Sequence, residues 1–136
     1  MRSARHRGQE GFIREVVWLA LGLAIIAIVM LDAMALFTAH NTVRDDAATA
    51  AKEARTTYAQ YLDVRAARAA AKTYLENSGD RLLRFKAVKM EDGTAGFTVT
   101  CTTSAKTYGF KYLAHVPGLS AWVRDLSNPV CAQTSD

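Results

Sequence analysis

The chain has 136 residues, half of them hydrophobic, and its 17 basic and 13 acidic residues give a formal net charge of +4. The mean hydropathy of -0.02 averages two unlike parts, because residues 16–37 hold 21 non-polar residues and one charge while the rest is polar and rich in alanine. This division largely excludes a soluble cytoplasmic enzyme, and the residues after Phe37 are enough for one modest core.

Residues 1–15 form a basic leader. Far fewer net positive charges follow the apolar run, since Arg44 and Lys52 there lie beside Asp45 and Asp46. By the positive-inside rule, the leader is predicted to be cytoplasmic and the C-terminal part extracytoplasmic. The arginines that precede the run are Arg2, Arg5, Arg7 and Arg14.

Residues 16–37 are predicted to form a single transmembrane helix. Twenty-two helical residues rise about 33 Å, close to the thickness of a bilayer's hydrocarbon core, and Trp18 lies near the entry, where interfacial aromatics are common. The alternative is a signal peptide cleaved after Ala35, because Ala33-Met34-Ala35 fits a small-x-small site. The apolar run is, however, longer than the roughly 7–15 residues usual for the hydrophobic part of a signal peptide.

Asp32 is the one charged residue in the run. An acid at membrane depth costs about 3 kcal/mol on insertion scales, which makes it a functional candidate. Two interpretations are open: an acid that reaches the outer interface, favoured by its place in the last third of the run, and an acid that is buried and paired.

Residues 38–78 are predicted to form an extracytoplasmic helix. They are rich in alanine, contain no proline or glycine, and end at the stop signal Asn77-Ser78-Gly79-Asp80. Nothing after Phe37 demands a break, so the two helices are expected to form one rod of about 60 residues, roughly 90 Å long. Asn41 as the cap of a separate helix is the alternative.

A stripe of small residues runs along this second helix. Small side chains allow helix backbones to approach closely. We expect the half nearer the membrane to contact another subunit and the half nearer Leu75 to pack on the chain's own C-terminal domain. The candidate assembly residues are Ala47, Ala51, Ala54 and Tyr58.

Residues 81–136 are predicted to form a small β-rich domain. Alternating apolar residues and the turn at Glu91-Asp92-Gly93-Thr94 indicate a hairpin of residues 82–91 and 95–103, with Phe97, Val99 and Cys101 on one face. A third strand is expected over 106–113, then a turn at Pro117-Gly118 and a short helix over 119–126. The predicted fold class is therefore α+β: a long N-terminal transmembrane helix that continues outside the membrane and packs against a small antiparallel sheet.

The only cysteines, Cys101 and Cys131, both lie on the predicted outer side. Oxidising compartments favour disulfides, so a Cys101–Cys131 bridge is expected. The chain has no C-x-x-C pair and no histidine pair with metal-ligand spacing, and it lacks phosphate-binding, dinucleotide-binding and hydrolase motifs. We therefore expect no enzymatic activity, no catalytic residues, no metal or cofactor, and no nucleic-acid partner.

The layout resembles that of type IV pilin-like proteins, and most closely the TadE-like pseudopilins of tight-adherence (Flp) pilus systems in Gram-positive, high-GC bacteria. Three stretches carry the resemblance: residues 7–15 (RGQEGFIRE) before the apolar run, residues 47–55 (AATAAKEAR) after it, and FTVTC at 97–101 with VPGL at 116–119.

The resemblance implies a minor pilin or a pseudopilin-like component of pilus assembly or secretion. Such a protein assembles through its N-terminal helix with membrane lipid and with pilin-like subunits, itself included. It also implies leader processing between Gly11 and Phe12, with Glu15 pairing with a neighbour's terminal amine, although Glu15 would be the fourth residue after the cut and the family places its glutamate fifth. The alternatives are an accessory subunit of another bacterial membrane complex, or a small secreted domain released after Ala35.

Overall fold

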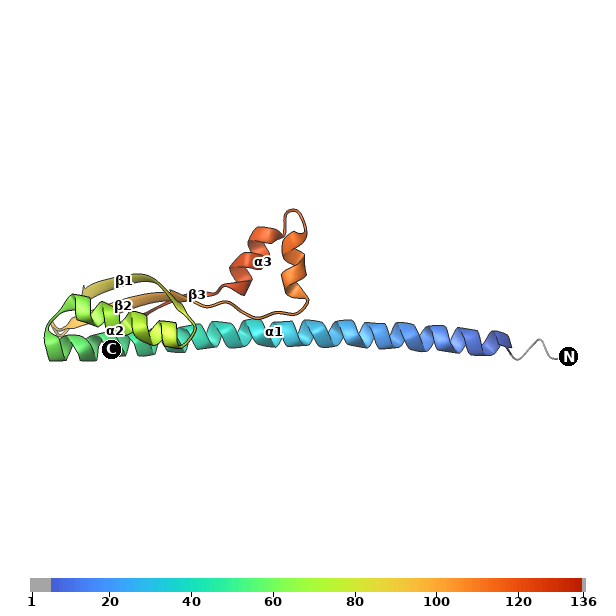
Figure 1. Cartoon of the computed structure of the whole chain (residues 1–136), viewed down its shortest axis with the longest axis horizontal. Helices are drawn as coiled ribbons and strands as arrows, with labels where there is room; N and C mark the ends of the chain where they lie inside the picture. Colours follow the sequence, from blue (N-terminus) through green and yellow to red (C-terminus); the bar gives the residue numbers. More distant parts are fainter. Residues whose placement is uncertain (1–5, 136) are drawn as a thin grey trace.

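The computed structural model describes the backbone of residues 6–135 and the side chains of residues 11–135. Arg2 and Arg5 of the leader, and the side chain of Arg7, lie outside the described residues. A long helix runs the length of the molecule, and all other elements gather on its C-terminal half (Figure 1). In chain order the elements are α1 (His6–Tyr61), α2 (Val64–Asn77), β1 (Arg81–Lys89), β2 (Ala95–Thr102), the 3-10 helix η1 (Phe110–His115), α3 (Ser120–Ser127) and β3 (Val130–Thr134).

Helix α1 continues without interruption from the apolar run into the outer part of the chain. Its 56 residues correspond to a rod of about 84 Å. The expected continuity across Phe37 is therefore confirmed, and Asn41 does not begin a separate helix.

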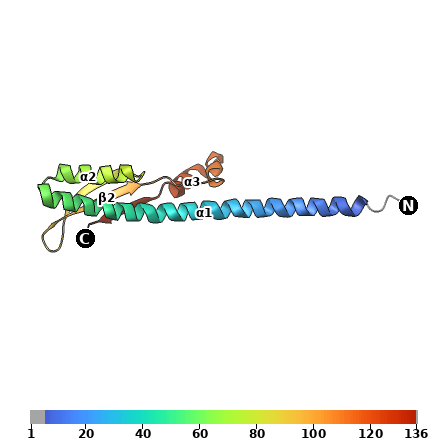
Figure 2. The ribbon, with the colours of Figure 1, turned by 60° about the horizontal axis from the view of Figure 1, so that its bottom comes forward.

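The predicted helix 38–78 is nevertheless wrong in one respect, because it breaks at Leu62-Asp63 and folds back on itself. Leu62 adopts a positive φ of 52°, and the Asp63 side chain accepts a hydrogen bond from the backbone N–H of Arg65 at 2.9 Å, as an N-cap residue does. Helix α2 therefore packs antiparallel against α1 instead of extending the rod (Figure 2).

The sheet has the antiparallel order β1-β2-β3. The predicted hairpin is confirmed, with Gly93 at φ 82° in its turn. A register irregularity lies between Leu82 and Arg84 of β1. Because an extra residue in a strand shifts the side chains that follow to the other face, Leu82 and Phe85 are both partly buried although they are three residues apart.

The predicted third strand is wrong. Residues 106–109 form a loop and residues 110–113 belong to η1, while the third strand is β3 near the C-terminal end of the chain. The predicted turn at Pro117-Gly118 and the short helix after it are confirmed, the helix as α3.

The core lies between the sheet and the helical hairpin of α1 and α2. Phe97, Val99 and Cys101 share the buried face of β2, as the alternation predicted. The ring of Phe97 stacks on Phe85 with centroids 5.3 Å apart and meets Tyr58 of α1 edge-on at 5.4 Å. These layers confirm an α+β fold with a long apolar N-terminal helix and a small antiparallel sheet.

Candidate functional site

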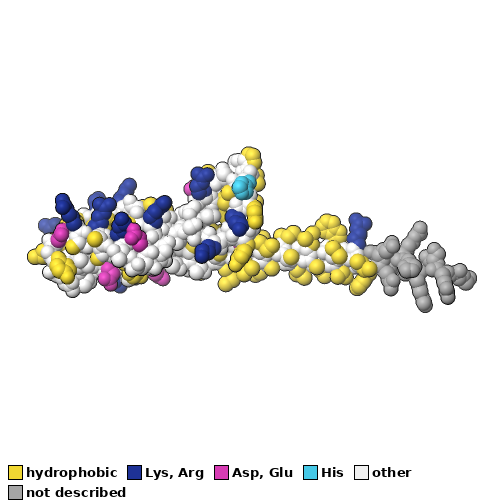
Figure 3. All heavy atoms as spheres, viewed as in Figure 1, with side chains coloured by type: hydrophobic (Ala, Val, Ile, Leu, Met, Phe, Trp, Pro, Cys, Tyr) yellow, Lys and Arg dark blue, Asp and Glu magenta, His cyan; other side chains and the backbone are white. Residues whose placement is uncertain are grey.

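The N-terminal half of α1 exposes apolar side chains all round the helix. From Phe12 to Phe37 its large hydrophobic residues are mostly uncovered, and the most apolar window has a mean hydropathy of 2.5. Figure 3 shows this half as a nearly unbroken apolar surface, with charged side chains gathered on the outer half of the molecule. Among the described residues, α1 is the one helix long and apolar enough to cross a membrane.

The small-residue stripe farther along α1 is not such a surface, which corrects one expectation. Ala47, Ala51 and Ala54 are fully buried in the chain's own core, and Tyr58 packs against that core. The half of the stripe nearer the apolar run, which was expected to contact another subunit, is thus buried within this chain. Small side chains here let α2 and the sheet approach α1 closely, so this stripe is not free for another subunit.

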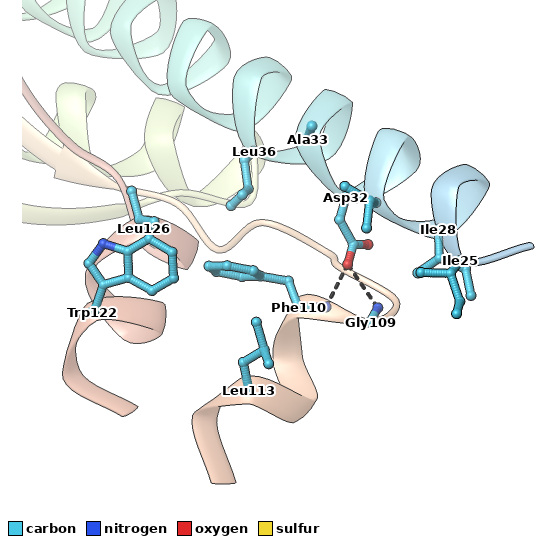
Figure 4. A pocket seen from close by; sticks show the side chains of 11 residues that line it. Ile25, Ile28, Asp32, Ala33, Leu36, Gly109, Phe110, Leu113, Trp122 and Leu126 are labelled. Atoms are coloured by element: carbon cyan, nitrogen blue, oxygen red, sulfur yellow. Dashed lines mark hydrogen bonds between the residues drawn. The ribbon is translucent and has the colours of Figure 1, made fainter. Parts of the chain in front are cut away.

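Asp32 is the most strongly bonded polar side chain of α1. It is 5% exposed, although it lies between uncovered apolar neighbours. Its Oδ1 accepts the backbone N–H of Tyr108 at 2.6 Å. Its Oδ2 accepts the backbone N–H groups of Gly109 at 2.8 Å and of Phe110 at 2.5 Å (Figure 4). Both oxygens act only as acceptors, which is the bonding pattern of an ionised carboxylate.

This bonding favours the paired interpretation of Asp32 over the solvent-reaching one. The three N–H groups belong to the start of η1, where a helix leaves its first donors unsatisfied and attracts negative charge. Gly109 permits the approach, because a Cβ atom there would lie 2.8 Å from Cγ2 of Ile28. The sequence marks Asp32 as unusual but gives no sign of its partners, which are backbone groups 76 to 78 residues away.

A groove opens between α1 and the segment that Asp32 holds. Its volume is about 540 Å³, and its walls are apolar except for Asp32. Ile25, Ile28 and Leu36 form the α1 wall, while Phe110 and Trp122, whose rings meet edge-on at 5.5 Å, stand opposite (Figure 4). No sequence motif predicts this groove, because its apolar residues come from three separate segments of the chain, α1, η1 and α3.

The residues of the expected leader processing site lie far from this groove. Gly11, Phe12 and Glu15 follow one another along the exposed first described turns of α1. Glu15 precedes Asp32 by 17 residues, which is about 25 Å along the helix. The structure therefore does not bring Glu15 and Asp32 together.

The two cysteines are neighbours but not bonded. Cys101 on β2 lies directly opposite Cys131 on β3 in the strand register, which places their side chains on the same face of the sheet. Both are free thiols in the structure, so the expected bridge is not present in it. Burial raises the pKa of Cys101 to about 12, and its Sγ contacts the carbonyl oxygen of Val43 at 3.5 Å. A thiol of this kind is protonated and unreactive near neutral pH.

Two carboxyl groups, those of Asp46 on α1 and Asp80 in the turn between α2 and β1, lie side by side. Asp80 is 5% exposed, and its Oδ2 has no hydrogen-bond partner among the residues that the structure describes. Asp46 of α1 lies beside it and accepts a hydrogen bond from the Tyr74 hydroxyl at 3.3 Å. Burial and the neighbouring Asp80 carboxyl raise the pKa of Asp46.

This contact makes stability depend on pH. The folded chain holds the Asp46 proton more tightly than the unfolded chain, so the stabilisation is present below about pH 4 and is lost as the pH rises through the raised pKa. We expect Asp80→Asn to raise the free energy of unfolding at pH 7 by roughly 1 kcal/mol, the order of a one-unit pKa shift, since it removes a buried like charge beside Asp46. The gain should shrink toward pH 4 in urea titrations. Glu53→Gln, at an exposed acid on α1, should change stability little at either pH; an equal gain from both variants would contradict the assignment.

Within the described residues no group of three or more His, Cys, Asp or Glu side chains is placed to hold a metal ion. Comparison with known proteins gives no match, whether to a family model, a curated protein or a solved structure. The site is therefore defined by its own geometry: an uncovered apolar helix, and the segment that begins at Tyr108 and is held to this helix by Asp32.

Proposed function

We propose that this chain is a non-enzymatic, single-pass membrane protein that assembles with other subunits through the N-terminal half of α1. We further propose that it serves as a minor pilin or pseudopilin-like component of pilus assembly or secretion, with the leader cytoplasmic and the sheet outside. The observation that carries the proposal is the uncovered apolar half of a 56-residue helix, whose other half buries its small-residue face in the chain's own core.

The bare apolar length fits a bilayer. Val16 to Phe37 covers 22 residues, of which Asp32 alone is charged, and corresponds to about 33 Å of helix. In water such a surface would be strongly unfavourable, because large exposed apolar patches are rare on soluble monomers. Lipid and neighbouring apolar helices are the environments that match it.

One face of this segment is free for other subunits. Residues 25, 28, 32 and 36 line the groove, so the opposite face of the helix points away from the outer domain. Leu23, Met30 and Phe37 lie on that opposite face at seven-residue spacing and are each more than half exposed. We place the assembly contact on this face, in place of the buried alanine stripe.

Release of a soluble domain by cleavage after Ala35 is disfavoured by Asp32. A cut there would remove the carboxylate that accepts three backbone N–H groups of the outer domain. It would also remove much of the α1 wall against which Phe110 and Trp122 stand. An accessory subunit of a different membrane complex would use the same features, and the identity of the cross-linked neighbour separates it from a pilin.

Cysteine cross-linking in native membranes tests the proposal. In a Cys131→Ser background, we expect Leu23→Cys, Met30→Cys and Phe37→Cys to give adducts with a second copy or with a pilin-like subunit. Ile25→Cys, on the groove side of the same helix, is the matched control and should give few adducts. If none of the three positions gives an adduct although a lipid-soluble maleimide labels them, the assembly role is wrong.

A further inference from the structure

The structure contains an arm that stands crosswise on α1. This arm, residues 108–127, consists of η1, the turn after it and α3, and it leaves α1 sideways before the chain returns to β3 (Figure 1). It meets α1 along the groove described above, between Ile25 and Leu36. Since the arm runs across a helix that crosses the membrane, it lies along the membrane plane.

The arm lies at the level of the outer leaflet. The apolar run begins at Val16, directly after Arg14 and Glu15, and its 16 residues to Leu31 rise about 24 Å, most of a hydrocarbon core about 30 Å thick. Asp32, which holds the arm, is the next residue. The carboxylate accepts all three N–H groups, so these donors are paired and the carboxylate is hydrogen-bonded at this depth.

The exposed side chains of the arm suit a membrane interface. Tyr108 is 66% exposed and Trp122 is 53% exposed, and tyrosine and tryptophan are the residues enriched at the boundary between lipid and water. The arm and the loop that enters it carry three basic residues, Lys106, Lys111 and Arg124, against one acidic residue, Asp125. This composition matches that of segments which lie in the headgroup region, with apolar side chains toward the acyl chains and basic ones toward the phosphates.

The apolar side of the arm faces the membrane-spanning part of the chain. In Figure 3 the edge of the arm that looks toward the N-terminal half of α1 is lined with apolar side chains. The groove continues this edge onto Ile25 and Val29, which are themselves exposed in the apolar half of α1. The apolar surface of α1 is therefore continuous with the apolar walls of the groove, so an acyl chain that lies against α1 can extend into the groove.

We propose that the arm is a second membrane contact, which lies in the outer-leaflet interface and receives phospholipid acyl chains in the groove between η1, α3 and α1. The inference rests on the proposed membrane-spanning role of α1. It adds that the outer domain is held against the bilayer surface, at the level set by Asp32, and does not project freely on its helix.

The two tryptophans allow a direct test, because one reports on the span and the other on the arm. The full chain is reconstituted in phosphatidylcholine vesicles as Trp18→Phe, which leaves Trp122, and as Trp122→Phe, which leaves Trp18. Both substituted residues are exposed, so neither change disturbs the core. Emission is then compared in plain lipid and in lipid brominated near the carbonyl end or near the methyl end of its acyl chains.

We expect Trp122 to lose a fraction of its emission comparable to that lost by Trp18, and to lose more with bromine near the carbonyl end. If Trp18 is quenched while Trp122 keeps the same intensity in all lipids, the arm lies clear of the bilayer. That outcome overturns the inference, makes the groove a site for a protein, and leaves the membrane-spanning role intact. If neither tryptophan is quenched, α1 does not span the membrane, and the proposed function fails with the inference.

Discussion

Replacement of Asp32 by asparagine should release the arm from α1. The amide has the same size but retains one acceptor oxygen in place of two, and its NH₂ group would face the backbone N–H donors of Tyr108, Gly109 and Phe110. Hydrogen bonds to a charged group stabilise by about 1.5–3 kcal/mol each, and unmade buried donors carry a further cost. With partial hydration of the opened loop, we expect the local opening free energy to fall by about 2–3 kcal/mol.

Hydrogen exchange of the full chain in lipid nanodiscs measures this loss. Because about 1.4 kcal/mol corresponds to a tenfold change in an equilibrium, the amides of residues 108–110 should exchange roughly 30- to 150-fold faster. The sheet, held by its own core, should exchange as before. Asp45→Asn, at an exposed acid on the same helix, is the control and should leave residues 108–110 protected. Unchanged exchange in the Asp32 variant would mean that the carboxylate does not hold the arm.

Phe97→Ala should cost the outer domain much of its stability. Phe97 is fully buried between Phe85 and Tyr58 and is the largest fully buried side chain. Truncating a buried phenylalanine to alanine typically costs about 3–5 kcal/mol, through lost burial and the cavity that remains. Since small domains are stable by only about 5–15 kcal/mol, we expect the sheet to unfold readily while the apolar N-terminal half of α1 stays helical.

Susceptibility of the outer domain to protease in increasing urea gives the free energy of unfolding for this comparison. Leu83→Ala removes a large apolar side chain from the neighbouring strand, but one that is 48% exposed, so it should cost far less than Phe97→Ala. Equal losses from the two variants would contradict the placement of the core between the sheet and the helices.

The local pattern of apolar residues was sufficient to predict the β1–β2 hairpin and the apolar half of α1. The alternation of Phe97, Val99 and Cys101 around a glycine turn predicted the hairpin and its buried face, and the apolar run predicted the exposed half of α1. The sequence gives only a weak indication of the fold-back at Leu62. Leu62 adopts a positive φ although it is not a glycine, so the capping residue Asp63 is the one local signal of the break. Tertiary packing of α2 on α1 decides that break.

Long-range contacts account for the remaining errors. Residues 106–113 alternate like a strand, but three of their backbone donors, those of Tyr108, Gly109 and Phe110, bond to Asp32 instead of to a neighbouring strand. Strand β3 is five residues long and has little pattern of its own, so only its pairing with β2 identifies it. The alanine stripe was predicted correctly as a close-packing surface, but whether it packs within the chain or between chains depends on the fold-back of α2.

The central claim, that α1 crosses a membrane and separates the leader from the sheet, is tested most directly by labelling intact cells with a membrane-impermeant maleimide. In a Cys131→Ser background with Cys101 buried, Glu91→Cys in the exposed β1–β2 turn should be labelled in intact cells. Ser3→Cys in the leader should be labelled only after the membrane is permeabilised. Labelling of both positions in intact cells, or protection of Glu91→Cys until permeabilisation, would contradict the account.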